Sequence, residues 1–483
     1  MRLAVVLRNI TVISAATCSW VALAAAWSSP AHSETLKQAL AAAYRTNPEL
    51  ESERSRLRAA DEGVAIANSG YRPRIGANGS LSWEKTTTDP ASAATIAVGP
   101  TGSILTDSGI NRHARYGFYA SQPLFTGFQV TNQVRIAEAN VRGGRETLRG
   151  AEGNLFVQVV SAYVNVIASR KILNLQEQNV SLMQKHVRSA RERLAFNELT
   201  NTDVAQAQLR MANAQAIVAT GRAEVITSRG AYVTFVGHEP NNLTDPTFPR
   251  GIPKSLDEAL AIASRENPQI VRAVHLEDAA RHAVELARGR LLPQVSLGAG
   301  WGEDHNHDRS STTRSTVVEG RMNVPLYEGG EIHAQVRQAK QIHLSSLQAI
   351  DAIRAQVHQS VTAAWSQYDA VRARIDLARQ QIRTSQTALD GVRREEGIGQ
   401  RTLLDVLNAQ QDYIDAQINM VSVRRFELIT AYILMAQIGR LDATLLEMDP
   451  VYDPTVHFDE VHRKWFGLTI SYPDGRREVV KAP

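Results

Sequence analysis

Residues 35–50 read TLKQALAAAYRTNPEL, and residues 255–270 read SLDEALAIASRENPQI, so the chain contains nearly the same segment twice. The two copies lie 220 residues apart. This offset continues without a gap into YRPRIGANGSLSW at residues 71–83 and LLPQVSLGAGWGE at residues 291–303. Self-similarity sustained in this way is the signature of an internal structural repeat. The 483-residue chain is therefore predicted to hold two copies of one structural unit.

The offset then falls to 202 residues, because QPLFTG at residues 122–127 matches VPLYEG at residues 324–329. The difference of 18 residues lies within residues 83–116, which are polar and rich in glycine, serine and threonine. Insertions are tolerated in exposed loops and not in packed helices. The new offset then holds as far as Gly237 and Gly439, which predicts long helices whose register cannot slip.

These matches divide the chain into four expected parts. Residues 1–33 precede the repeats, residues 34–253 form the first repeat, residues 254–447 form the second, and residues 448–483 are a tail of different composition. Each repeat has the order helix, β-hairpin, long helix, turn and returning helix. The expected hairpins cover residues 73–126 and 293–327, and the expected long helical regions cover residues 127–236 and 330–440.

Each repeat is expected to begin with a capped helix. Ser33 and Ser255 precede runs of alanine and leucine, and serine is a favoured N-cap residue. An Asn-Pro pair follows within each segment, at Asn47-Pro48 and Asn267-Pro268. Because proline disfavours the helical conformation at the residue before it, the helix is predicted to break and restart at both pairs.

Strands are predicted to begin at Pro73 and Pro293, where apolar and small or polar residues start to alternate. Return strands are expected at residues 116–125 and 317–327. Strands of about 10 residues with one apolar face are long enough to cross an outer membrane, although a hairpin on a soluble protein has the same pattern. Four strands cannot close a barrel, and an open edge in lipid leaves backbone groups unpaired. Several chains would therefore have to share one barrel, and the pattern alone does not choose between two chains and three.

The long helical regions are predicted to pair. Residues 128–196 contain no proline, and at about 1.5 Å per residue they would form a rod of about 100 Å. Such a rod is stable only when it packs against partners, here a second helix expected at residues 203–235. In the intervening turn Asn197 aligns with Gly399 of the second repeat, and both residue types tolerate a left-handed backbone.

The first 33 residues have the pattern of a secretory signal peptide. Arg2 and Arg8 precede an uncharged stretch at residues 10–27, and small residues then allow cleavage before Glu34. An uncleaved signal anchor is the alternative. Cys18 is the one cysteine of the chain, and the threonine before it disfavours lipid attachment. The mature chain is thus expected to have no disulfide and no cysteine-bound metal.

Charge and hydropathy exclude two further classes of protein. The formal charge is +4, and removal of Arg2 and Arg8 leaves about +2, with no basic stripe interleaved with aromatic residues. Nucleic acid is therefore not an expected partner. No later segment reaches the ~18 uncharged apolar residues of a membrane-spanning helix, and residues 156–169 come closest.

Two aspartates occupy aligned positions after the turns, Asp203 in NTDVAQAQ at residues 201–208 and Asp405 in RTLLDVLNAQ at residues 401–410. Either they cap two helices or they belong to one functional site. The sequence lacks a lysine-bearing phosphate loop, a His-Glu-x-x-His motif and a Gly-x-Ser-x-Gly motif, so no enzyme and no cofactor are expected. EDHNHD at residues 303–308 is expected to be a solvated loop and not a metal site.

Taken together, these motifs resemble the TolC family of outer-membrane efflux channels over about residues 34–441. The resemblance implies a mainly α protein with membrane β, in which two structural repeats per chain form a trimeric 12-strand β-barrel joined to a long α-helical coiled-coil barrel. It is carried by NPEL at residues 47–50, QPLF at 122–125, VPLYEGG at 324–330, TDV at 202–204 and LDV at 404–406.

The resemblance also implies a function. The chain would be a passive homotrimeric exit duct of a tripartite efflux or type I secretion system, crossing the outer membrane and periplasm of a Gram-negative bacterium. Outer-membrane lipid would surround the barrel, and the partners would be a periplasmic adaptor (membrane fusion) protein and an inner-membrane ABC, RND or MFS pump. The alternative is a non-channel coiled-coil structural protein of the periplasm or surface. For residues 448–483, packing on the equatorial belt and adaptor contact both stay open, and the cargo is not readable.

The family's periplasmic entrance maps onto particular residues of this chain. Asp405 matches the entrance aspartate, so three copies would form a ring of carboxylates, and such rings select cations. Asn408 stands where the best-known member has a second acid, so the ring would carry three charges and not six.

A gate-closing network is implied beside this ring. Arg401 matches the family's gate arginine, which ties the second-repeat coil to Thr202 and Asp203 of the first repeat. Glu396 stands where the family has a partner tyrosine. This replacement removes a phenol and is expected to place a negative charge near Asp203.

Overall fold

The computed structural model describes residues 33–87, 109–307, 310–470 and 472. Nearly all of the expected signal peptide, including Cys18, lies outside the described residues. The same is true of residues 88–108 in the long loop of the first repeat and of residues 473–483 of the tail.

Two compact units make up the described chain. The first, called here the coil unit, holds the residues up to Glu53 together with residues 147–270 and 354–452. The second, called the sheet unit, holds residues 54–146, residues 271–353 and the residues from Asp453 onward. Both units therefore draw on both repeats.

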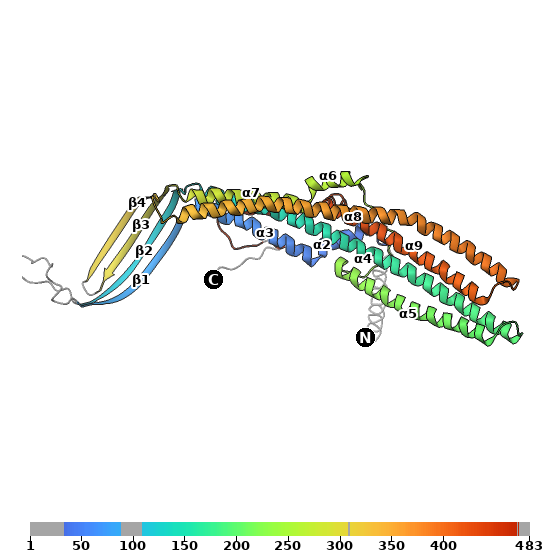
Figure 1. Cartoon of the computed structure of the whole chain (residues 1–483). Helices are drawn as coiled ribbons and strands as arrows, with labels where there is room; N and C mark the ends of the chain where they lie inside the picture. Colours follow the sequence, from blue (N-terminus) through green and yellow to red (C-terminus); the bar gives the residue numbers. More distant parts are fainter. Residues whose placement is uncertain (1–32, 88–108, 308–309, 471, 473–483) are drawn as a thin grey trace, which may run out of the picture. The chain divides into compact units, whose positions relative to one another are not determined.

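The sheet unit contains one antiparallel sheet in the order β1-β2-β3-β4, seen as four adjacent arrows in Figure 1. The central pairing, β2 with β3, joins the hairpin of the first repeat to that of the second. The outer strands β1 and β4 each pair on one side only among the described residues. The strands are β1 (Arg74–Thr86), β2 (Gly109–Phe125), β3 (Gln294–Asn306) and β4 (Ser311–Asn323).

The register gives the sheet two different faces. Phe118 of β2 lies opposite both Ala77 of β1 and Trp301 of β3, and residues that are directly opposed project from the same face. The neighbouring positions in register add Ile75 and Val318 to this apolar face, where both side chains are exposed. The opposite face carries mostly polar and small residues. The apolar and polar faces predicted from the alternation are therefore confirmed.

Two expectations about the strands were wrong. β4 ends at Asn323 and does not continue to residue 327. Residues 303–306 of the EDHNHD stretch are part of β3 and not of a loop. Asp304 is held in the sheet by its neighbour β2, because His113 Nδ1 lies 2.9 Å and Arg115 Nε 2.8 Å from its carboxylate. Position 308 lies outside the described residues.

The helix breaks predicted at the two Asn-Pro pairs are confirmed. Asn47 and Asn267 are extended, and each side-chain Oδ1 accepts a backbone N–H of the following helix. Each asparagine thus satisfies a donor that the helix itself leaves unpaired. The helices on either side are α2 (Leu36–Thr46), α3 (Pro48–Asn68), α6 (Leu256–Glu266) and α7 (Pro268–Gly289).

The first cap is Thr35 and not the predicted Ser33. The Thr35 hydroxyl accepts from the Gln38 N–H, and Gln38 Oε1 accepts from the Thr35 N–H at 2.8 Å. This reciprocal pair is a capping box. The prediction for the second repeat is confirmed, since the Ser255 hydroxyl accepts from the Glu258 N–H at 3.2 Å.

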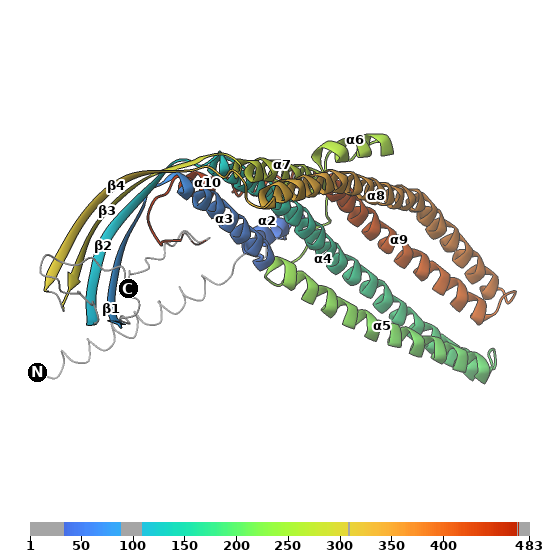
Figure 2. The same ribbon diagram turned by 60° about the vertical axis from the view of Figure 1, so that its left-hand side comes forward.

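Four long helices follow the strands. α4 (Gln129–Ala195) and α8 (Glu331–Gly397) each have 67 residues, and α5 (Asn201–Val236) and α9 (Leu403–Gln437) return beside them in the coil unit (Figure 2). α4 contains the one stretch, among the described helices, that is long and apolar enough to qualify as a membrane span. Since 56% of that stretch is buried in the protein, its apolar residues are explained by packing within the chain.

The left-handed turn positions are confirmed. Asn197 has φ 59° and Gly399 has φ 78°. The described part of the chain also has a 3₁₀ turn at Ser69–Tyr71 before β1 and a short helix α10 (Val456–Val461) in the tail.

We expect Gly399→Ala to weaken the α8–α9 turn by about 1–2 kcal/mol, because a side chain makes the left-handed conformation unfavourable. Gly397→Ala is the matched control. Both glycines face open space, but Gly397 is helical, so alanine there is neutral or stabilising by up to about 1 kcal/mol. Hydrogen exchange of residues 395–405 measures both effects. Equal exchange in the two variants would contradict the strain account.

Candidate gate at the helical turns

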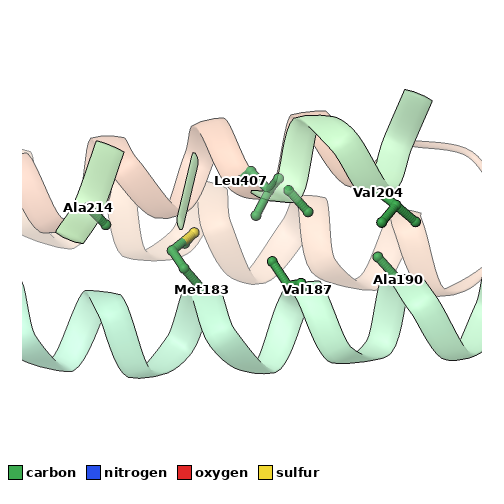
Figure 3. Packing of buried hydrophobic residues seen from close by; sticks show 7 residues of the cluster. Met183, Val187, Ala190, Val204, Ala214 and Leu407 are labelled. Carbon is green, nitrogen blue, oxygen red and sulfur yellow. The ribbon is translucent and has the colours of Figure 1, made fainter. Parts of the chain in front are cut away.

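A small hydrophobic cluster joins the two helical hairpins near their turns. In Figure 3 the side chain of Leu407 lies between the facing helices α4 and α5. α9 of the second repeat is thereby packed against both helices of the first. The members of this tip cluster are Met183, Val187 and Ala190 of α4, Val204, Ala207 and Ala214 of α5, and Leu407 of α9.

Asp203 and Asp405 begin the returning helices as members of two capping boxes. Asp203 Oδ2 accepts from the Thr200 N–H at 2.9 Å and from the Thr200 hydroxyl at 2.7 Å. Asp405 Oδ2 accepts from the Thr402 N–H at 3.0 Å and from the Thr402 hydroxyl at 2.8 Å. In return each threonine hydroxyl accepts the backbone N–H of its aspartate at 3.2 Å. The capping interpretation of the two aspartates is therefore confirmed.

These hydrogen bonds also keep both aspartates charged. The Thr200 hydroxyl and then its backbone N–H lower the pKa of Asp203, and the Thr402 N–H and then its hydroxyl lower the pKa of Asp405. Only Oδ2 of each carboxylate is used in its box. Among the described residues neither Oδ1 has a hydrogen-bond partner. Each aspartate can therefore cap its helix through Oδ2 and accept a further hydrogen bond through Oδ1.

Arg401 does not contact Thr202 or Asp203 within one chain. Its Nε donates to Glu395 at 3.0 Å, across the turn that joins α8 to α9, and both side chains are about half exposed. Exposed ion pairs of this kind contribute about 0–1 kcal/mol. Arg401 is therefore weakly held in the single chain.

Within one chain Glu396 pairs with an arginine and not with the groups around Asp203. Glu396 of α8 accepts from Arg193 of α4 at 2.5 Å, and the same arginine also pairs with Glu198 at 3.2 Å. An arginine from the first repeat thus neutralises the charge that replaces the family's tyrosine. The pair joins the two hairpins through a charge-assisted hydrogen bond.

Asn408 takes part in a second contact between the hairpins. Its Oδ1 accepts from Arg210 of α5 at 2.9 Å. Sequence reasoning missed both arginines, although a signal was available. Asn197 and Gly399 occupy aligned positions in the two turns. Arg193 lies four residues before Asn197, and Glu396 lies three residues before Gly399, so the two opposite charges are nearly the same number of residues from their turns.

His186 is a polar group inside this predominantly apolar interface. It belongs to α4, and its buried Nε2 has no hydrogen-bond partner among the described residues. Burial lowers the pKa of His186, Arg393 lowers it further, and Glu396 acts in the opposite direction. The imidazole is therefore held in its neutral form.

We expect the turn region to lose stability as the pH falls below the ordinary histidine range. The pKa of His186 is lower in the folded chain than in the unfolded one, so below pH about 6.5 the unfolded state binds more protons. Hydrogen-exchange protection of residues 180–210 should therefore fall between pH 7 and pH 5, and His186→Gln should flatten this dependence. His358→Gln, at an exposed histidine of α8, should leave it unchanged. An equally steep pH dependence in His186→Gln would exclude His186 as its source.

Comparison with known proteins establishes the family. The profile of the family described as "Outer membrane efflux protein" matches residues 39–238 and 259–440, which is most of the chain. The chain belongs to the outer membrane efflux protein family. The resemblance to TolC-type channels predicted from the sequence is thereby confirmed.

Individual relatives agree with this assignment. The outer membrane efflux protein BepC of Brucella suis biovar 1 is 37% identical over 449 residues, covering 92% of this chain and 93% of BepC. The alkaline protease secretion protein AprF of Pseudomonas aeruginosa is 27% identical, covering 68% of this chain and 70% of AprF. The crystal structure of the Campylobacter jejuni CmeC outer membrane channel has a TM-score of 0.70 at 15% identity, covering 89% of both chains, and is similar in fold.

Membership of the family fixes the broad function. This outer membrane efflux protein is a transport duct and not an enzyme, and it resides in the outer membrane with its helical part in the periplasm. Proteins of this family are the outer-membrane components of tripartite efflux or secretion systems. Among the described residues no group of three or more histidine, cysteine, aspartate or glutamate side chains could hold a metal ion.

Proposed function

We propose that three copies of this chain form the exit duct, sharing one 12-strand barrel. The four-stranded sheet carries this proposal, because β1 and β4 lie at its edges and its apolar face is exposed. Unpaired edge groups are costly in lipid, and pairing β1 of one chain with β4 of the next removes every edge. On this proposal residues 34–253 and 254–447 remain the two repeats that each chain contributes.

The helical turns supply the periplasmic entrance of the proposed duct. The Asp405 side chains of the three protomers would form a ring of carboxylates. The uncharged Asn408 would lie about one turn further along α9. Because the Thr402 hydrogen bonds lower the pKa of Asp405, the ring would stay ionised at neutral pH. A ring of carboxylates in a narrow opening attracts cations and repels anions.

The closed entrance would be held by links between chains. In the trimer Arg401 would leave its weak pair with Glu395 and donate to Thr202 and Asp203 of a neighbouring protomer. Three features support this exchange. Asp203 Oδ1 is not used by the capping box, Thr202 is exposed, and the pair with Glu395 is itself half exposed.

Opening would require the two hairpins of one chain to separate. The Arg193–Glu396 and Arg210–Asn408 contacts both run from the first hairpin to the second, so both would oppose this motion. The tip cluster opposes it as well, through Leu407. Since a polar contact can be exchanged for water at little cost, these two polar contacts are the ones that a partner protein could release.

The specific partners are proposed to be a periplasmic adaptor protein and an inner-membrane ABC, RND or MFS pump. The relatives leave the cargo open, since one is named for efflux and another for alkaline protease secretion. Membership of the outer membrane efflux protein family excludes the alternative of a coiled-coil structural protein without a channel.

We expect Arg401→Ala to raise the single-channel conductance of the purified trimer in planar bilayers. Each lost link of about 1 kcal/mol would shift the ratio of open to closed entrances about fivefold. Arg394→Ala is the control, because Arg394 is an exposed arginine that donates to Asp390 O of its own helix. No channel activity from folded trimer in any form would exclude the duct. A normal channel that Arg401→Ala leaves unchanged would exclude only this gate.

We expect Asp405→Asn to reduce cation selectivity, because it removes all three charges of the proposed ring. The measurement is the reversal potential in a KCl gradient, which should move toward the value of an unselective pore. Asp412→Asn, at an exposed aspartate further along α9, should change it much less. Equal shifts in the two variants would place the selective charge elsewhere.

A further inference from the structure

Within the sheet unit, three contacts fasten the tail to α3 and the residues after it. His457 Nδ1 lies 3.1 Å from a carboxylate oxygen of Asp61, a residue that is only 1% exposed. Further along, Asn68 Nδ2 donates to His462 O at 3.1 Å. Arg72 Nη1 then donates to Lys464 O at 2.7 Å. The tail therefore follows α3 toward the start of β1.

Arg72 holds the end of this path at the base of the sheet. Its guanidinium lies over the Trp465 ring, 4.8 Å from the centroid, which is a cation–π contact. Arg72 immediately precedes Pro73 and the first residue of β1. Trp465 also lines a shallow hollow together with Pro73 and Gln122, which is close to the end of β2. Trp465 is thus fixed where the strands begin and end.

Beyond this clamp the tail exposes a series of large apolar side chains. Trp465 is 60% exposed and Phe466 87% exposed, and Leu468 and Ile470 are exposed as well. Arg463 and Lys464 directly precede them. Aromatic residues beside basic ones are typical of the boundary between a membrane and water, where rings enter the lipid and cations meet phosphate groups.

Other exposed apolar residues lie where the chain enters or leaves the strands. Leu124 and Phe128 flank the end of β2, and Leu326 and Tyr327 follow β4, all of them exposed. These positions place exposed apolar side chains between the sheet and the first turns of the helices. Membrane barrels carry such girdles of aromatic residues at their interfaces with water.

We propose that residues 463–470 are an interfacial anchor in the periplasmic leaflet of the outer membrane. Trp465 and Phe466 lie at the boundary between acyl chains and headgroups, and Arg463 and Lys464 bind lipid phosphates. The proposal rests on the proposed function, since it requires the sheet to span the membrane. We assign phospholipid to this surface for two reasons. Trp465 is held at the base of strands whose apolar face enters the same membrane, and the basic side chains beside it complement lipid phosphate.

The mature chain allows a direct test, because residues 34–483 contain no cysteine. A nitroxide would be attached to Phe466→Cys in the trimer, reconstituted in vesicles of phosphatidylethanolamine and phosphatidylglycerol. Its collisions with oxygen and with a water-soluble nickel chelate would then be compared. Leu81→Cys on the apolar face of β1 gives the lipid reference, and Leu377→Cys, an exposed leucine of α8 in the coil unit, gives the aqueous one.

We expect the label at position 466 to resemble the label at 81, with oxygen collisions exceeding those of the chelate severalfold. A label at 466 that resembles 377, while 81 reports lipid, overturns the anchor and leaves the duct intact. A label at 81 that reports water overturns the proposed function, and the anchor with it. If neither reagent reaches the label at 466 and labels of different protomers show spin coupling, the segment contacts a second copy of the chain. This result would overturn the lipid assignment.

A second pair of variants tests the role of the charges. Arg463→Gln with Lys464→Gln should move the label at 466 toward the aqueous reference in vesicles that contain phosphatidylglycerol. Arg56→Gln with Arg58→Gln, on α3, is the control with the same loss of charge and should leave the label in place. Equal behaviour of the two pairs would overturn phosphate binding by Arg463 and Lys464. Assembly of each variant is checked as trimer in detergent.

Discussion

Unpaired backbone groups at the two sheet edges are the constraint on which the proposed assembly of this protein depends. A four-stranded sheet in the order β1-β2-β3-β4 leaves one edge on β1 and one on β4. In water such edges are tolerable, but in lipid each unsatisfied group costs several kcal/mol. Because its apolar face is exposed, the sheet is not stable in water by itself. In the proposed trimer, pairing with other chains satisfies the edge groups while the apolar face lies in lipid.

The helical turns combine two kinds of interaction with different consequences. The tip cluster excludes water and holds α9 against α4 and α5 through apolar contacts alone. The Arg193–Glu396 and Arg210–Asn408 contacts add direction, because they form only at one register of the hairpins. A gate needs both, since the tip cluster packs the two hairpins together while the polar contacts determine which arrangement is favoured.

Two errors of sequence interpretation have identifiable physical causes. Thr35 caps α2 because Gln38 stands three residues later and completes a capping box, a signal that Ser33 lacks. Residues 303–306 look like a solvated loop because they are polar, yet β2 supplies His113 and Arg115 as partners for Asp304. Within one chain the charge of Glu396 pairs with an arginine on another helix, a partner that analogy with a tyrosine does not predict.

The sequence by itself determined the features that depend on neighbouring residues. The repeat, the helix breaks at Asn47 and Asn267, the left-handed turns at Asn197 and Gly399 and the alternating strand faces all follow from local backbone preferences. Only the tertiary structure decided which distant groups meet. Arg193 contacts Glu396, which is 203 residues away in the sequence, and Arg72 contacts the tail, 392 residues away. Such contacts form only because the packed helices and strands bring remote side chains together.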